Sequence, residues 1–287
     1  MGAGTPTPSP KRFGTCYVAA LDDELLMFDC GPASTHKLTR MGLWPTDVNH
    51  LFFSHHHFDH NVDYPCFLLC RWDQSTEKTP PLNVYGPTPT REVTELLIGP
   101  KGAFFPDWQA RVEHPGSLEI YQSRGGRLPR RPPLVEVREI DGGESVNRGG
   151  WRVSCARVKH IEPWMPTLAY RLEFGGTSLV ITSDTGYCRG IIDFARGADH
   201  LLVHCWDLQS RMRPAEAGMI TGTLEAARIA SEAGVSSLLL SHLGPRLDRP
   251  DDRKKAEDDI AGVFHGEFRF LDELSTIPLE GRPPSAN

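Results

Sequence analysis

The residues best suited to chemistry lie in one short stretch, SHHHFDH, at residues 54–60. It places His55, His57 and His60 close to Asp59, directly behind the apolar residues LFF. Because His55 and His57 are two positions apart, their side chains point to the same side in an extended segment. Neutral imidazoles and carboxylates are the ligands that divalent ions such as zinc accept. The stretch therefore predicts a metal site.

Three more potential ligands each close an apolar run. His160 follows SCARVK, Asp184 follows LVITS and His242 follows SSLLLS. If these runs are strands, each brings its ligand to the carboxyl end, the edge where open α/β sheets place their sites. A lone histidine at a strand end is more often a structural residue, but four such ends together favour a metal site. Seven ligands are too many for one tetrahedral ion and suit a pair bridged by a carboxylate.

The elements that must position these ligands alternate in the first half of the chain. CYVAALDDELLMFDCGP predicts two strands turned at Asp22-Asp23, and STHKLTRMGL predicts a helix capped by Ser34. VNHLFFSHHH reads as a strand entering a loop, and LNVYGPTPTREVTELLIG as a strand, a turn and an amphipathic helix. This order indicates an α/β layer architecture.

The second half begins with a Pro/Gly-rich stretch, residues 117–160, which then predicts a β-meander. AYRLEFGGTSLVITSDTG is typical of a hairpin closed by Gly175-Gly176. IIDFARGADHLLVHCWD predicts a helix and a strand, and TGTLEAARIASEAGVSSLLLSH a long helix with a C-terminal glycine and a further strand. Residues 275–287 are expected to fray.

Composition sets limits on class and location. With 287 residues, 39% hydrophobic and 24% charged, the chain is expected to be globular with a real core. A net charge of −6 argues against a surface built to hold phosphate backbones, so nucleic acid is an unlikely partner. Seven cysteines without a C-x-x-C pair suit a reducing, cytoplasmic compartment. No apolar run is long enough to span a membrane.

SHHHFDH resembles the H-x-H-x-D-H motif of the metallo-β-lactamase fold superfamily, and the later ligands follow in the order that superfamily uses. FDCGP, SDTG and GADHLLVH are similar to the branch containing ribonuclease Z and the metal-dependent arylsulfatases. The resemblance implies an α/β (α+β) fold of the αββα sandwich type, with two β-sheets back to back and helices outside. It further implies a single domain over residues 1–287.

The resemblance also implies two divalent metal ions, with zinc expected and manganese or iron as alternatives. Asp59 would in addition be catalytic, because it could orient the attacking water or receive its proton. Asp29, in FDCGP, would either support the motif loop from behind or cap a turn. The implied ligands are His55, His57 and His160 for one ion, Asp59, His60 and His242 for the other, and Asp184 as the bridge.

Two positions depart from the pattern of ribonuclease Z. There, a glutamate follows the histidine of LLVH and a histidine opens the next helix, and both are linked to proton transfer. Here Cys205 and Ile220 occupy these positions. Trp164, just beyond His160, could line a substrate pocket or pack in the core.

An arginine-rich stretch, SRGGRLPRRPP at residues 123–133, has two interpretations. It could contact a phosphate or sulfate, or it could be a solvated surface loop, which is the more common outcome for such a run. Its arginines are Arg124, Arg127, Arg130 and Arg131.

These features predict a dinuclear metal-dependent hydrolase that uses a metal-bound hydroxide on a small-molecule ester, either a sulfate ester, a phosphodiester or a lactone or carboxylic ester. The main alternative is a ribonuclease Z-type tRNA 3′-end endonuclease. An iron-dependent redox enzyme and a non-catalytic scaffold are further alternatives, and a homodimer is one expected state of assembly.

Overall fold

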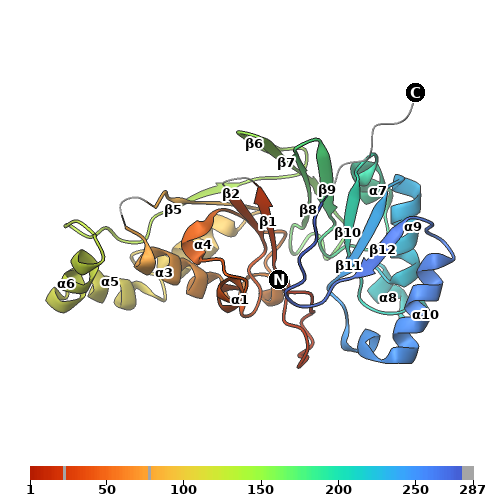
Figure 1. Cartoon of the computed structure of the whole chain (residues 1–287), viewed down its shortest axis with the longest axis horizontal. Coiled ribbons are helices and arrows are strands. Elements are labelled where there is room, and N and C mark those ends of the chain that lie inside the picture. The colour runs from red at the N-terminus through yellow and green to blue at the C-terminus, as the bar shows by residue number, and fades with distance from the viewer. Residues whose placement is uncertain (22–23, 77–78, 280–287) are drawn as a thin grey trace. The chain divides into compact units, whose positions relative to one another are not determined.

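A computed structural model describes residues 1–21, 24–76 and 79–279. Their contacts form two compact units, one of Met1 and residues 16–139 and the other of residues 2–15 and 140 onward (Figure 1). Each unit contains one sheet flanked by helices, which confirms the predicted fold class of two sheets with helices. The single domain over the whole chain stays a prediction. The Asp22-Asp23 turn and residues 280–287 of the expected frayed tail lie outside the described residues.

The first unit has a five-stranded sheet in the order β1-β2-β3-β4-β5. β1 and β2 form the predicted antiparallel hairpin, and β2 to β5 run parallel. Because the strands from β2 onward are parallel, their carboxyl ends meet at one edge. The strands are β1 (Tyr17–Leu21), β2 (Glu24–Phe28), β3 (Val48–Phe52), β4 (Leu82–Gly86) and β5 (Val135–Glu139).

Some helices of the first unit bury apolar residues against this sheet. Leu38, Phe67 and Ile98, from three of these helices, join Leu51 and Val84 of the strands in one buried cluster. The helices are α1 (Ser34–Arg40), α2 (Phe58–Asn61), α3 (Tyr64–Gln74), α4 (Thr90–Ile98), α5 (Phe105–Glu113) and α6 (Pro115–Ser123), with the 3-10 turn η1 (Pro45–Asp47).

Two details of the first unit differ from the sequence prediction. Ser34 does not cap α1: Ala33 is the N-cap, and the Ser34 hydroxyl donates to the Gly31 carbonyl at 2.6 Å. The carboxylate of Asp63, distant in sequence, accepts from the Thr35 amide instead. Residues 117–123 form the end of α6, and β5 joins the first sheet beside β4 rather than the later meander.

The second unit has a seven-stranded sheet in the order β12-β11-β10-β9-β8-β7-β6. β6 to β9 are antiparallel neighbours and β9 to β12 are parallel. Gly175 and Gly176 close the β8-β9 hairpin with φ of 51° and 79°, values that glycine adopts without strain. The strands are β6 (Ser145–Arg148), β7 (Trp151–Arg157), β8 (Leu168–Phe174), β9 (Thr177–Ile181), β10 (His200–His204), β11 (Ser237–Ser241) and β12 (Glu267–Phe270).

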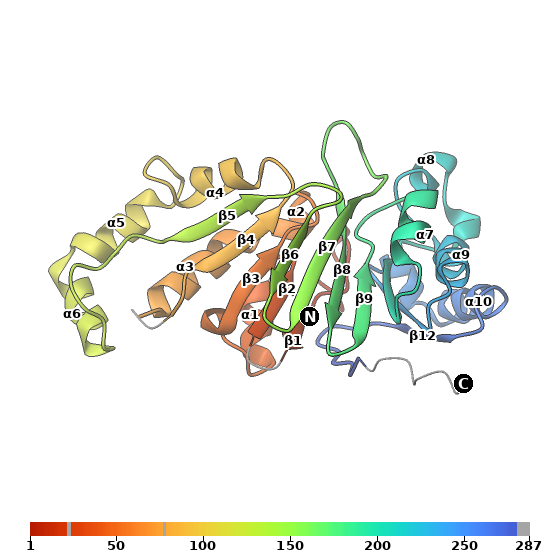
Figure 2. The same ribbon diagram turned by 90° about the horizontal axis from the view of Figure 1, so that it is seen from above.

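Helices cover the parallel half of this sheet. α9 (Thr223–Ala233) packs on β10 and β11, with α7 (Arg189–Ala195) and α10 (Pro250–Ala261) beside it (Figure 2). Gly234, with φ of 68°, ends α9 as the sequence predicts. The remaining short elements are η2 (Gln209–Arg211), α8 (Pro214–Ala217) and η3 (Pro245–Asp248). None of the described helices has both the length and the apolar character needed to cross a bilayer.

Candidate metal centre

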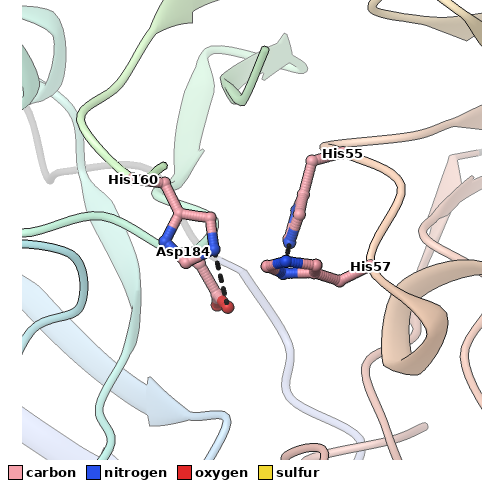
Figure 3. A group of neighbouring side chains, drawn as sticks. All are labelled: His55, His57, His160 and Asp184. Atoms are coloured by element: carbon pink, nitrogen blue, oxygen red, sulfur yellow. Dashed lines mark hydrogen bonds and ion pairs between the residues drawn. The ribbon is translucent and has the colours of Figure 1, made fainter. Parts of the chain in front are cut away.

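The first unit holds the SHHHFDH loop where the chain leaves β3. His55 Nε2 lies 3.0 Å from His57 Nδ1, and the two rings meet edge to face (Figure 3). Asp59 and His60 follow in α2, with His60 Nε2 3.5 Å from Asp59 Oδ2. His55, Asp59 and His60 are buried. Four potential metal ligands of the first unit therefore lie within residues 55–60.

Asp29 supports this loop from the end of the neighbouring strand β2. One carboxylate oxygen accepts from the Ser54 amide at 2.7 Å, and the other accepts from the Ser54 hydroxyl and His60 Nδ1, both at 2.8 Å. The bond to Asp29 occupies His60 Nδ1 and leaves Nε2 as the nitrogen that can bind a metal, the arrangement found where a carboxylate orients a metal-binding histidine. The prediction that Asp29 supports the motif loop is confirmed.

Replacing Asp29 by alanine should weaken metal binding by about 10- to 100-fold, because His60 loses the partner that orients its ring. Competition with a chromogenic zinc chelator measures the affinity. Asp63→Ala is the matched control, because Asp63 accepts from the Thr35 amide in α1 and is not one of the residues named as metal ligands. A wild-type affinity in Asp29→Ala would contradict the orienting role.

In the second unit, potential ligands meet at the carboxyl edge of the sheet. β9, β10 and β11 are parallel, so Asp184, His204 and His242, at or just beyond their ends, lie at the same edge. β7 also runs in this direction, because it is antiparallel to β8 and β8 is antiparallel to β9. His160, which follows β7, comes to that edge too. The prediction that these residues lie at strand ends holds within this unit, and their binding of a metal stays a prediction.

Asp184 is the centre of these residues. Its Oδ1 lies 2.7 Å from His204 Nδ1 and 3.5 Å from His242 Nε2. Its Oδ2 lies 3.9 Å from His160 Nε2 (Figure 3). His160 Nδ1 donates to the Met219 carbonyl at 2.8 Å, which leaves Nε2 as the nitrogen that can bind a metal.

His204 lies in this cluster, although sequence reasoning did not name it there. It is fully buried, and its ring stacks on His242 with centroids 4.9 Å apart and an interplanar angle of 5°. The signal was present, because HLLVH is an apolar strand that ends in histidine like the others. Asp184, His204 and His242 each offer a ligand atom within 4.8 Å of the others.

Backbone strain marks the same strand ends. Asp29, Ser183 and His242 have φ of 59°, 60° and 54°, in the left-handed region that non-glycine residues avoid. Such residues persist where the surrounding structure enforces them, and they concentrate at functional sites. Each lies just beyond a strand. Asp29 supports His60, Ser183 precedes Asp184, and His242 is itself a potential ligand.

The donors in both units are imidazoles and carboxylates, and this chemistry fits divalent metal ions. Of the residues named as ligands from the sequence, all but Asp59 offer a ligand atom to a cluster that is compatible with metal binding. Zinc as the particular ion, and the division of the ligands between two ions, stay predictions.

Cys205 and Ile220 offer no proton carrier at the positions where the resemblance predicts one. Cys205 is fully buried within the apolar cluster that α9 forms with the sheet, and burial raises the pKa of its thiol to about 12. The thiol therefore stays neutral at pH 7. Ile220 has no titratable group, so neither side chain can exchange protons in that range.

Comparison with known proteins identifies the family. The family model described as "Beta-lactamase superfamily domain" matches residues 25–243. Ribonuclease Z of Mycobacterium bovis is 27% identical over 98% of both chains, and that of Mycolicibacterium gilvum is 29% identical over 97% of this chain and 94% of the relative.

Solved structures share the fold. The metallo-β-lactamase fold protein YhfI from Bacillus subtilis has a TM-score of 0.72 at 22% identity, covering 95% of this chain and 94% of that one. The short form of human tRNase Z has a TM-score of 0.66 at 19% identity, covering 97% of each chain.

The prediction that nucleic acid is an unlikely partner is wrong, because the relatives named ribonuclease Z act on RNA. The net charge of −6 misled because it is a sum over the whole chain, whereas nucleic acid is bound by local clusters of Lys and Arg. The ligand motif, the two sheets and the matched family model lead to one conclusion: this chain belongs to the metallo-β-lactamase superfamily and is a metal-dependent hydrolase.

Proposed function

We propose that the chain hydrolyses phosphodiester bonds in RNA, as a ribonuclease Z-type endonuclease. The observation that carries this proposal is the similarity to ribonuclease Z along almost the full length of both chains. The ligand residues of both units support it, since no position of the metal-binding motif is replaced by a residue that cannot bind a metal.

Within this proposal, the seven ligands named from the sequence would hold two divalent ions. The carboxylate of Asp184 would be shared by both ions, a role supported by its position among three histidines of its own unit. Bound divalent ions supply a Lewis acid for the phosphoryl oxygen and lower the pKa of a coordinated water. One ion would be held by His55, His57 and His160, and the other by Asp59, His60 and His242.

The remaining chemistry falls to side chains of the chain. Asp59 orients the attacking water or takes its proton, in addition to holding an ion. His204 donates from Nδ1 to Asp184 Oδ1 and so fixes the orientation of that carboxylate. Asp29 fixes His60 in the same way.

A precursor tRNA with a 3′ extension is the substrate that tests the proposal. The metal-loaded protein should shorten it to a discrete product on a denaturing gel, and Asp184→Ala should leave it intact. Failure to cleave any precursor tRNA, with rapid turnover of aryl sulfates or carboxylic esters by the same preparation, would reject the proposal.

A second candidate, hydrolysis of a small ester, is favoured by Cys205 and Ile220. Without proton carriers at these two positions, a substrate that departs as a stable anion is easier to cleave than one that departs as an alkoxide. Small phosphodiesters, sulfate esters and lactones with such leaving groups belong in the same assay.

Trp164 offers a separate test of RNA as the substrate. It is 87% exposed on the loop after His160, where its amide donates to the Ile161 carbonyl at 3.0 Å, so it does not pack in the core. An exposed indole four residues after a potential metal ligand suits stacking on a nucleobase, an interaction worth about 1–3 kcal/mol.

We therefore expect Trp164→Ala to raise KM for RNA by about 10-fold or more while leaving kcat/KM for a small aryl phosphodiester unchanged. Trp44→Ala, at a tryptophan that is also exposed but follows no potential ligand, is the control. Equal effects of the two substitutions on RNA would show that Trp164 has no special part in binding.

A further inference from the structure

The first unit contains a cavity of about 480 Å³ away from the SHHHFDH loop. It lies between the end of α3, the start of β4, Tyr121 of α6 and the arginine-rich stretch that leads into β5. Among the described residues that line it there are four arginines and no aspartate or glutamate. This is a concentrated positive charge in a chain of net charge −6. The arginines are Arg71, Arg127, Arg130 and Arg131.

Arg71 is a buried cation without a paired carboxylate in the described part of the chain. It is 5% exposed, and its Nε and Nη2 donate to the backbone carbonyls of Val48 and Pro80 at 3.0 and 2.9 Å. Burial lowers the pKa of Arg71 to about 10, so the guanidinium is still charged at neutral pH. Burying a charge beside neutral groups alone is costly, and an anion in the cavity would offset that cost.

Arg130 is a second fixed cation in the wall. It is 6% exposed, and its guanidinium carbon lies 4.3 Å from the ring centre of Trp72 and 4.7 Å from that of Tyr121. Its Nη2 also donates to Asp73 Oδ1 at 2.9 Å. The stacked rings and the carboxylate hold the guanidinium in place, which makes it preorganised for a ligand.

Asp73 does not neutralise this region, because it serves three arginines. Arg111 and Arg124 pair with it at 3.1 and 3.3 Å, besides Arg130. Burial acts to raise the pKa of Asp73, but hydrogen bonds from Arg130 and Arg124 outweigh it and lower the pKa. Asp107 also pairs with Arg111, so two carboxylates face three guanidinium groups and positive charge remains in excess.

The shape and lining of the cavity indicate the ligand. Arginine favours phosphate, because its planar donors match the oxygens of that group. The volume exceeds that of a lone phosphate, and Trp72, Tyr121 and several prolines add apolar wall suited to a sugar or base. We propose that this cavity binds the phosphate of a nucleotide, with Arg71 and Arg130 as the fixed cations.

The nucleotide has two possible sources that share this chemistry: a free mononucleotide, or a nucleotide of an RNA chain, which rests on the proposed function. Calorimetric titration of the full chain with AMP, inorganic phosphate and a short single-stranded RNA separates them. EDTA is present throughout, so that no phosphate is held by metal ions. Because these titrations need no turnover, they test the cavity independently of precursor tRNA cleavage.

Arg71→Met keeps most of the side-chain volume and removes the charge, and should weaken binding of AMP or RNA about 10- to 100-fold. Arg131 also lines the cavity but is exposed, so Arg131→Gln should leave the fold intact and weaken binding about 2- to 5-fold. Thr79→Glu places a carboxylate in the lining and should abolish binding while raising the unfolding temperature. Arg189→Gln removes a surface cation of α7 in the other unit and should have no effect.

Binding of AMP that is tighter than that of inorganic phosphate, with these losses, supports a free nucleotide. Binding of RNA but not AMP, with the same losses, supports a nucleotide of an RNA chain. Absence of binding by all three probes overturns the proposal. It is equally overturned if Arg131→Gln and Thr79→Glu bind as the wild type does, which decides the matter even if Arg71→Met fails to fold.

Discussion

Asp184→Ala should reduce bound metal from about two ions per chain to one or fewer and should abolish hydrolysis, because one carboxylate is proposed to serve both ions. The loss of activity should exceed the roughly 10- to 100-fold that follows when a supporting partner such as Asp29 is removed. Elemental analysis of purified protein gives the stoichiometry, and an aryl phosphodiester assay gives kcat/KM.

Asp141→Ala is the control for this experiment. Asp141 lies in the same unit but forms an exposed ion pair with Arg157, so its loss should leave metal content and activity unchanged. Full occupancy by two ions in Asp184→Ala would contradict the shared carboxylate, and a wild-type protein with one ion would contradict the dinuclear assignment.

Leaving-group dependence should produce the second large effect. General-acid assistance to a departing oxygen contributes roughly 10²- to 10⁴-fold, and Cys205 and Ile220 cannot provide it. Across a series of aryl phosphodiesters, kcat/KM should therefore fall steeply as the pKa of the leaving phenol rises. A shallow dependence would show that another residue supplies the proton, and His56, in hydrogen-bond contact with Thr90, would be the first to replace.

Ile220→His should flatten this dependence by restoring an imidazole, whereas Ile220→Ala should not. Cys205→Glu should not restore function, since the new carboxylate would enter an apolar cluster at a cost of several kcal/mol. Urea unfolding measures that cost. Stability of Cys205→Glu equal to the wild type would show that the side chain can leave the cluster.

The sequence predicts those parts of the protein that depend on local pattern. Strands followed by a histidine or aspartate can be recognised because apolar runs and ligand types are both visible in the letters, as for β11 and His242. The β8-β9 hairpin was predictable because Gly175-Gly176 supplies the positive φ that the turn needs.

Features that depend on distant contacts could not be predicted. β5 pairs with β4 across three helices, and no local pattern tells which sheet a strand joins. Asp63 replaces Ser34 as the partner of the first turn of α1 because the loop after α2 brings it there. Arg130 looks like a solvated loop residue in sequence, yet it is buried because Trp72 and Tyr121 enclose it.

The left-handed residues at the strand ends have a consequence for the evolution of heat resistance in this protein. Each costs of order 1–3 kcal/mol, which is a sizeable part of the total stability of a domain. Ser183→Gly would relieve this cost at a position beside Asp184, yet glycine would also loosen the backbone that aims the carboxylate. Selection for thermostability and selection for turnover would thus act in opposite directions on Ser183. Variants that gain both must be stabilised by substitutions at other positions.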